Sequence, residues 1–276
     1  MVALLGVGVV PTDTPILRAD DLGVLRGDGI FETLHIRGGQ PWLLDAHLAR
    51  MAQSAERLEI PLPPAAELAE LVEQACASWP EDVEGALRLV CTRGSEDSGP
   101  VTVFATLAPV GEASRRARHT GVAVATATFG VAAGTRSAAP WLLGGAKTLS
   151  YAINMASQRW AQTVGADDVL WVSSDGYALE APTSSLVWRD GERLCTVPAE
   201  ATGILPGTTA RFLLDHAGEL GLTAAEQMVK PADLSSVDGA WLLSSVRGIA
   251  EIRSVDGVQR WPTNDTTRLR TLLGYA

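Results

Sequence analysis

The stretch from residue 129 to residue 145 constrains the fold most, because it separates two regions that carry regular hydrophobic patterns. It is rich in Gly, Ala, Ser and Pro and follows neither a helix nor a strand period, which is typical of a connecting segment. A chain of 276 residues, 46% of them hydrophobic, is long enough for two domains that each have a core. We therefore predict a small N-terminal domain over 1–128, an interdomain loop over 129–145 and a C-terminal domain over 146–276.

The N-terminal region mixes strand and helix signals. Residues 30–36 favour an extended strand that ends at a Gly38-Gly39 turn, and Asp45 can cap a helix. The apolar positions of that helix recur every three or four residues: Leu48, Met51, Ala55 and Leu58. The remaining predicted elements are a helix over 65–78 and buried strands over 86–91 and 101–107.

The C-terminal region shows the same mixture. One helix face is predicted from five apolar positions: Leu149, Ile153, Ala156, Trp160 and Val164. A second helix is expected over 208–220, and the predicted strands are 168–173, 185–188, 193–197 and 240–245. Strands and helices alternate without a strict βαβ rhythm, so we expect a mixed α/β (α+β) fold and not a doubly wound parallel sheet.

Charge and composition exclude several classes of partner. The formal net charge is −10 and the isoelectric point is about 4.9, which argues against nucleic-acid binding and against docking on anionic membranes. Cys76, Cys91 and Cys195 lack metal-ligand or disulfide spacing, so a reducing cytoplasm is expected. The N-terminus has no basic segment of a signal peptide, and no apolar run reaches the length of a membrane span.

Three features of the second half suit a pyridoxal phosphate site. Lys147 closes a Gly-rich stretch, Glu180 lies in an apolar run, and 203–211 combines Gly, Pro and Thr before a helical pattern. A lysine can form the Schiff base, a carboxylate can partner the pyridinium nitrogen, and a helix N-terminus can bind phosphate. Taken singly, a surface lysine, a solvated carboxylate and simple helix capping are commoner explanations, but the combination favours the cofactor site.

The order of the motifs resembles the class IV aminotransferase family, the fold type IV pyridoxal phosphate enzymes. The resemblance rests on Arg-Gly-Asp-Gly-Ile-Phe-Glu-Thr at 26–33, Ala-His-Leu-Ala-Arg-Met at 46–51, Lys147, Glu180 and Ile-Leu-Pro-Gly-Thr-Thr at 204–209. It implies a small N-terminal α/β domain, a larger C-terminal pseudo-barrel domain and a cofactor between them, usually in a homodimer. Members include branched-chain and D-amino-acid aminotransferases and 4-amino-4-deoxychorismate lyases.

The resemblance assigns roles in cofactor binding. Lys147 would be the catalytic lysine, Arg50 would bind the phosphate, and Tyr151 would hydrogen-bond the phenolic oxygen. Glu180 would partner the ring nitrogen, and Ser244 or Ser245 would supply a hydroxyl to the phosphate or to a substrate carboxylate. The phosphate turn contributes the remaining predicted residues: Leu205, Gly207, Thr208 and Thr209. Ser185 stands where many relatives have asparagine, which leaves its role open.

The small-domain motifs suggest residues for an anionic amine substrate. By resemblance, Phe31 and Glu32 line the substrate pocket. Arg88 alternates with apolar neighbours, so it could point inward and bind a carboxylate, although an outward arginine is equally common. Arg93 and Arg247 are the other candidate carboxylate ligands.

Competing motifs fail on their spacing. Gly6-Val7-Gly8 lacks the third glycine of a dinucleotide site, and alanine stands between glycine and Lys147 where a P-loop needs an uninterrupted Gly-Lys pair. The histidines have no metal-ligand spacing, so no metal is expected.

Three functions remain open at this point. The motifs look closest to the branch of 4-amino-4-deoxychorismate lyases and D-amino-acid aminotransferases. The first hypothesis is the lyase, which forms 4-aminobenzoate and pyruvate in folate synthesis. Transamination of D-amino or branched-chain amino acids would use the same residues. A non-catalytic binding protein that retains the fold is the alternative from another class.

Overall fold

The computed structural model describes residues 1–96 and 99–275, and this part of the chain divides into two compact units. The first contains Met1–Gly111 together with Ala146–Tyr151, and the second contains Glu112–Gly145 and the chain from Ala152 onward. The mixed α/β fold is confirmed, because each unit combines helices with a largely antiparallel sheet.

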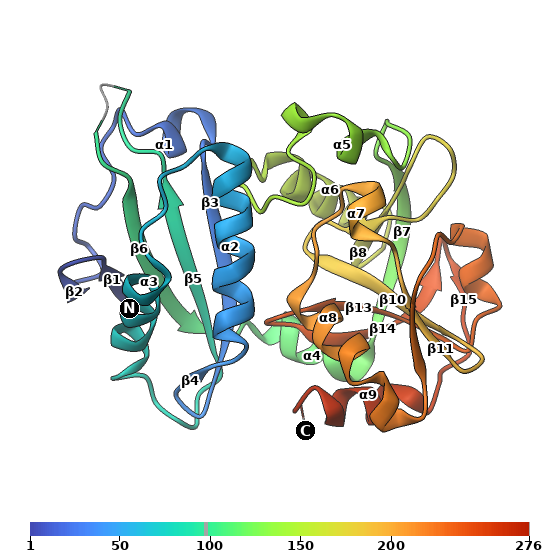
Figure 1. Ribbon diagram of the computed structural model, residues 1–276. Helices are drawn as coiled ribbons and strands as arrows, with labels where there is room; N and C mark the ends of the chain where they lie inside the picture. Colours follow the sequence, from blue (N-terminus) through green and yellow to red (C-terminus); the bar gives the residue numbers. More distant parts are fainter. Residues whose placement is uncertain (97–98, 276) are drawn as a thin grey trace. The chain divides into compact units, whose positions relative to one another are not determined.

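The first unit is a sheet with two helices on one face. In the described chain its strand order is β2-β1-β6-β5-β3-β4, with every neighbouring pair antiparallel. The strands are β1 (Val2–Leu4), β2 (Gly8–Val10), β3 (Gly29–Arg37), β4 (Gln40–Pro41), β5 (Gly85–Thr92) and β6 (Thr102–Pro109). The helices are α1 (Leu22–Arg26), α2 (Leu44–Leu58) and α3 (Ala65–Cys76). Figure 1 shows α2 and α3 lying over the same face of this sheet.

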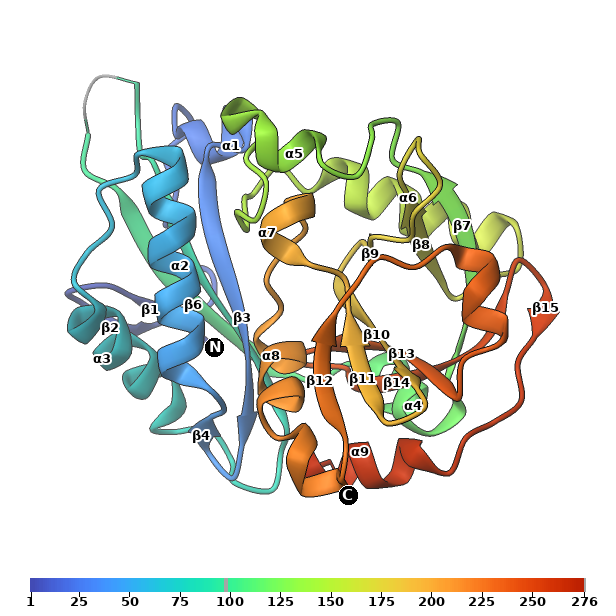
Figure 2. The same ribbon diagram turned by 45° about the vertical axis from the view of Figure 1, so that its right-hand side comes forward.

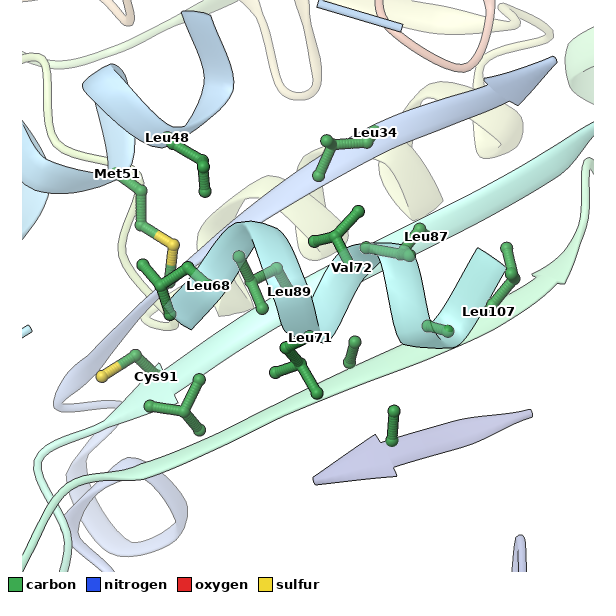
Figure 3. Packing of buried hydrophobic residues seen from close by; sticks show 14 of the residues in the cluster. Leu34, Leu48, Met51, Leu68, Leu71, Val72, Leu87, Leu89, Cys91 and Leu107 are labelled. Atoms are coloured by element: carbon green, nitrogen blue, oxygen red, sulfur yellow. The ribbon is translucent and has the colours of Figure 1, made fainter. Parts of the chain in front are cut away.

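Apolar side chains hold these helices to the sheet. The buried cluster joins alternate residues of β3, β5 and β6 to the apolar stripes of α2 and α3. Figure 3 shows Leu68, Leu71 and Val72 of α3 packed among Leu87 and Leu89 of β5. Burying one such leucine side chain contributes roughly 1.5–3 kcal/mol, so this face gives the first unit a core of its own.

The second unit is built on a larger, mixed sheet. Among the described residues the strand order is β12-β11-β10-β13-β14-β7-β8, with β9 paired to β10 and β15 paired to β14. The strands are β7 (Val122–Thr128), β8 (Asp168–Val172), β9 (Glu180–Ala181), β10 (Ser184–Asp190), β11 (Arg193–Thr196), β12 (Thr223–Glu226), β13 (Gly239–Ser244), β14 (Gly248–Val255) and β15 (Val258–Gln259). Parallel pairing joins β7 to β8 and to β14, and β11 to β12.

Helices surround this sheet. They are α4 (Glu112–Thr120), α5 (Thr135–Ala138), η1 (Pro140–Leu142), α6 (Ala152–Thr163), α7 (Ala199–Thr202), α8 (Thr208–Asp215), η2 (Ala217–Leu220), η3 (Pro231–Ser235) and α9 (Asp265–Leu272). Figure 2 shows α8 alongside β11 and β12. The single helix predicted over 208–220 is divided in the structure into α8 and the 3-10 helix η2.

The units do not follow the predicted domain boundaries. Hydrogen bonding explains both differences: β7 lies in the second sheet between β14 and β8, and Ala146–Tyr151 pairs with the start of β3. Lys147 consequently belongs to the first unit and not to the predicted C-terminal domain. Short helices, α5 and η1, occupy much of the stretch expected to be a loop.

Two further local predictions were wrong. Asp45 does not cap α2, because Leu43 is the N-cap residue and Asp45 lies in the first helical turn. The apolar face predicted for α6 is also incorrect: Ile153 and Trp160 are exposed, and Ala161 is the buried residue, packed against β8.

Candidate functional site

The backbone of Lys147 is fixed by pairing with the first residues of β3. Thr148 forms an antiparallel bridge with Ile30, and the Phe31 N–H donates to the Lys147 carbonyl at 3.1 Å. Residues opposite each other in an antiparallel pair point to the same face, so the Lys147 and Phe31 side chains lie on one side. The Lys147 Nζ is 4.5 Å from the centroid of the Phe31 ring.

Aromatic rings surround the Lys147 amine. Its Nζ donates to Tyr151 Oη at 3.4 Å and lies 5.3 Å from the Tyr151 ring centroid. The Phe31 and Tyr151 rings are in edge contact, with centroids 5.1 Å apart. Trp141, in the Gly-rich stretch before this lysine, is 79% exposed. The amine therefore lies on apolar surface, with the Tyr151 hydroxyl as a polar neighbour.

Behind this lysine, α2 and β3 share a buried ionic network. Glu32 is 0% exposed and accepts hydrogen bonds from Arg50 Nε at 2.7 Å and Arg50 Nη2 at 2.6 Å. His47 Nδ1 lies 2.7 Å from the second Glu32 oxygen. The arrangement follows from helical spacing, because residues 47 and 50 are one turn apart on the α2 face that meets β3.

This network fixes the charges of its members. Burial raises the pKa of the Glu32 carboxyl, but the charge and hydrogen bonds of Arg50, with help from His47, outweigh burial and leave that pKa at about 2. Burial lowers the pKa of His47 more than Glu32 raises it. The fully enclosed Glu32 carboxylate thus orients Arg50, and the prediction that Glu32 lines a substrate pocket finds no exposed surface to support it.

Ser54 is a site residue that the sequence analysis missed. Its hydroxyl donates to the Arg50 carbonyl at 3.0 Å and accepts from the Lys147 backbone N–H at 3.0 Å. Residues 47, 50 and 54 follow a spacing of three and four, so they form a polar line along α2 beside its apolar stripe. This polar spacing in the sequence was the signal that could have identified Ser54.

The predicted substrate arginines of the first unit have different surroundings. Arg93 donates to Asp28 at 2.6 Å and to the Leu58 and Glu59 carbonyls at 2.5 and 3.1 Å, so it caps the end of α2. The hydrogen bond to Asp28 raises the pKa of the Arg93 guanidinium. Arg88 is exposed on β5, with its guanidinium carbon 5.9 Å from the Phe31 ring centroid. Arg88 thus shares the Phe31 side of the sheet.

In the second unit, Glu180 is oriented by a backbone amide and an arginine. Its carboxylate accepts from the Leu205 N–H at 3.2 Å and from Arg136 Nη1 at 3.4 Å. Arg136 lies in α5, in the stretch that carried no sequence signal, and it was not predicted. Leu205 enters the site through its backbone and not through its side chain.

The predicted phosphate turn starts α8. Gly207 is the N-cap residue and supplies no side-chain cap, and a Cβ there would overlap the Ser185 hydroxyl of β10. Thr209 is 2% exposed, and its Oγ1 has no hydrogen-bond partner within the described residues. A helix N-terminus attracts anions through its N–H groups and dipole. A buried hydroxyl without a partner is costly, and its position at the start of α8 makes Thr209 a candidate for contact with an anion.

The β13–β14 hairpin lies next to this turn. Ser245 Oγ is 3.5 Å from Thr208 Oγ1, and Ser244 is the last residue of β13. Arg247 donates to Asp168 at 2.8 Å, and that carboxylate is 0% exposed. The structure therefore joins Thr208 to Ser245 but uses Arg247 in an internal ion pair.

The described residues provide neither a metal site nor a membrane span. Across 1–96 and 99–275, no group of three or more His, Cys, Asp or Glu side chains could hold a metal ion. The helices formed by these residues also include none with the length and apolar character needed to span a membrane.

Comparison with known proteins identifies relatives along nearly the whole chain. The family described as amino-transferase class IV matches residues 29–255. The bifunctional aminodeoxychorismate lyase / D-amino acid transaminase of Mycobacterium tuberculosis is 39% identical over 265 residues, 93% of this chain and 92% of that protein.

Solved structures give the same picture. The PLP-bound form of a hypothetical aminotransferase from Mycobacterium tuberculosis superposes with a TM-score of 0.96 at 38% identity, covering 99% of this chain and 97% of that one. A fold IV transaminase from Curtobacterium pusillum gives 0.90 at 37% identity, covering 96% and 90%.

Proposed function

The chain belongs to the class IV aminotransferase family, and we propose that it is a 4-amino-4-deoxychorismate lyase that releases pyruvate and forms 4-aminobenzoate for folate synthesis. It is an enzyme whose cofactor is pyridoxal 5'-phosphate, so a non-catalytic role for this fold is set aside. The choice of lyase is supported by the relative from Mycobacterium tuberculosis, whose name includes that activity, at 39% identity over most of both chains.

The residues present fit this cofactor. Gly207 leaves the first turn of α8 without a side-chain cap, and the unpartnered Thr209 hydroxyl beside the α8 N-terminus suits a phosphate. We propose that Thr208, Thr209 and Ser245 hold the phosphate, with Arg50 as its arginine. Glu180, already held by the Leu205 N–H, would accept from the ring nitrogen. Lys147 would carry the covalent bond to the aldehyde carbon.

The observation that carries this assignment is the placement of the Lys147 amine. When bound, pyridoxal phosphate withdraws electrons from the carbon that bears the substrate nitrogen. The Lys147 backbone is held by Phe31 and Ser54, and its amine lies beside the Phe31 ring and within 3.4 Å of Tyr151 Oη. Lys147 would take the proton from that carbon and return one as pyruvate leaves and the ring becomes aromatic.

Arg88 is the arginine best suited to bind a substrate carboxylate. Arg93 and Arg247 already hold Asp28 and Asp168, whereas Arg88 is exposed on the Phe31 side of the sheet. A guanidinium can bind a carboxylate through two parallel hydrogen bonds. Replacing Arg88 with Ala should raise KM about tenfold or more for an anionic amine, an effect of about 1.4 kcal/mol. Arg57→Ala, at an exposed position of α2, is the matched control.

Transamination is the second candidate function, because the name of the same relative includes D-amino acid transaminase. The two reactions share the first proton removal and differ in where the proton is returned. We expect the lyase reaction to be faster in this protein.

A paired assay on the purified holoenzyme tests the choice. One arm supplies aminodeoxychorismate and measures 4-aminobenzoate and pyruvate, and the other supplies D-alanine, or a branched-chain amino acid, with 2-oxoglutarate. The lyase proposal expects equimolar 4-aminobenzoate and pyruvate at a kcat/KM above that of the second arm. Amino transfer without 4-aminobenzoate would overturn it.

We further propose a homodimer in a reducing cytoplasm, acting on a small anionic amine and not on nucleic acid or membranes. Exposed apolar side chains on α6, Ile153 and Trp160, support an association surface. The buried free thiols of Cys76, Cys91 and Cys195 support a reducing compartment. Sedimentation equilibrium would measure the oligomeric state, and a single species at the monomer mass would refute the dimer.

A further inference from the structure

The turn of the β13–β14 hairpin has its successive carbonyl groups bound by side chains from elsewhere in the second unit. Tyr275 Oη donates to the Ser245 carbonyl at 2.5 Å. Arg118 donates through Nη2 to the Val246 carbonyl at 2.7 Å and through Nε to the Arg247 carbonyl at 3.0 Å. Every carbonyl from 245 to 247 is therefore fixed by one of these two side chains.

Arg118 and Tyr275 also brace each other. Arg118, on α4, is 6% exposed and Tyr275, which follows α9, is 3% exposed. The Arg118 guanidinium lies 4.5 Å from the Tyr275 ring centroid, a cation–π contact. A Cβ at Gly248 would lie 2.7 Å from the Tyr275 ring, so the hairpin approaches the ring closely. We call this pair the hairpin clamp.

The clamp determines where the amides of the turn point. In a planar trans peptide, the C=O and the following N–H point in opposite directions. With the Ser245 and Val246 carbonyls bound by the clamp, the N–H groups of Val246 and Arg247 are directed away from it. On the same turn, Ser245 Oγ lies 3.5 Å from Thr208 Oγ1 at the start of α8. One side of the hairpin is thus occupied by the clamp, while its serine hydroxyl borders the α8 N-terminus.

We propose that Arg118 and Tyr275 are positioning residues for the cofactor phosphate. By holding the turn, the clamp keeps the Ser245 hydroxyl and the Val246 and Arg247 N–H groups in an anion-binding arrangement before the ligand arrives. Donors fixed in advance bind more tightly because less conformational freedom is lost on binding. This inference rests on the proposed placement of the phosphate at α8 and makes no use of the choice between lyase and transaminase.

The experiment compares two ligands that differ only in the phosphate. Apoprotein is titrated with pyridoxal 5'-phosphate and with pyridoxal, and the absorbance of the lysine-bound form gives each dissociation constant. Tyr275→Phe keeps the ring stacked on Arg118 and removes only the hydroxyl. Arg118→Met keeps the aliphatic stem and removes the guanidinium. Arg115→Met, at an exposed position on the same helix, is the matched control.

The expected result is a loss of affinity confined to the phosphorylated ligand. Tyr275→Phe should weaken pyridoxal 5'-phosphate binding about tenfold and Arg118→Met about a hundredfold, with pyridoxal affinity within about twofold of the parent. Equal weakening of both ligands, or no weakening of either, would overturn the proposal. If Arg118→Met fails to fold, the affinities of Tyr275→Phe for the two ligands test the proposal. The melting temperature of Tyr275→Phe is measured to show that this variant is folded. A failed lyase assay would leave this result intact, because no turnover is measured.

Discussion

The buried carboxylate of Glu32 in the first unit and the buried hydroxyl of Thr209 in the second differ in their hydrogen bonding. In the first, Glu32 is completely enclosed and holds Arg50 and His47 through contacts of 2.6–2.7 Å. In the second, the oxygens of Thr209 and Ser184 are buried with no hydrogen-bond partner among the described residues. The Glu32 carboxylate finds its partners within the first unit, whereas we propose that the Thr209 hydroxyl finds its partner in a bound phosphate.

The energetic scale explains why this difference matters. A buried hydroxyl without a partner costs about 1–3 kcal/mol. A protein tolerates such a cost where binding recovers it, as the proposed phosphate beside α8 would do. In the first unit, the charges of Glu32 and Arg50 instead neutralise each other. Their ion pair orients the Arg50 side chain and stabilises the fold whether or not a ligand is present.

Lys147→Ala has the largest expected effect, because the proposed covalent attachment depends on this amine and the proposed phosphate contacts do not. Borohydride reduction should fix cofactor to the parent protein and none to the variant, as measured by intact mass. The variant should still bind pyridoxal 5'-phosphate reversibly through the phosphate. Lys230→Ala, the chain's other lysine, is the control and should label like the parent. Labelling of the Lys147 variant would show that the lysine was misassigned.

Glu32→Gln comes next and tests the claim that the first unit is complete without ligand. Removing one partner of a buried ion pair strands the other charge, at a cost of about 3–5 kcal/mol. We expect the free energy of unfolding of the apoprotein, measured by urea titration, to fall by about that amount. Glu67→Gln, at an exposed position of α3, should change it by less than about 0.5 kcal/mol. Equal effects of the two substitutions would show that the Glu32 network does not stabilise the apoprotein.

Acid should destabilise the first unit through the same residues. The folded pKa of Glu32 is about 2, below its ordinary value of 4.5, so its contribution is present above pH 4.5 and lost as the pH falls towards 2. That shift corresponds to about 3 kcal/mol. The pKa of His47 is also lowered, chiefly by burial, so loss should begin below its ordinary value of 6.5. Urea titrations from pH 7 to pH 2 should show this decline, and Glu32→Gln should flatten its lower part.

Thr209→Val has the smallest expected effect and tests the second unit. Replacing the unpartnered hydroxyl with a methyl group should leave apoprotein stability unchanged or raise it by about 1 kcal/mol. The affinity for pyridoxal 5'-phosphate should fall about tenfold. Thr209→Ser retains the oxygen and should keep most of the affinity. A variant that loses stability and keeps its affinity would place the hydroxyl in a structural role.

Sequence periodicity correctly predicted elements that have one apolar and one polar face. The alternation and spacing around residues 30–36 and 48–58 gave β3 and α2 nearly at their true bounds, because one face of each must be buried. The pattern failed for α6, whose apolar residues Ile153 and Trp160 remain exposed in the described chain. A stripe of apolar residues shows that a face is hydrophobic, and it does not show what covers that face.

The sequence by itself determined the family and the cofactor, because these depend on residue types in a fixed order along the chain. Only the tertiary structure decided how the charged residues are used. Arg93 and Arg247 hold internal carboxylates, Arg88 is left exposed, and Ser54, Arg136 and Tyr275 act through partners distant in sequence. A side chain's role depends on which group lies within hydrogen-bond reach, and that distance is fixed only when separated segments pack together.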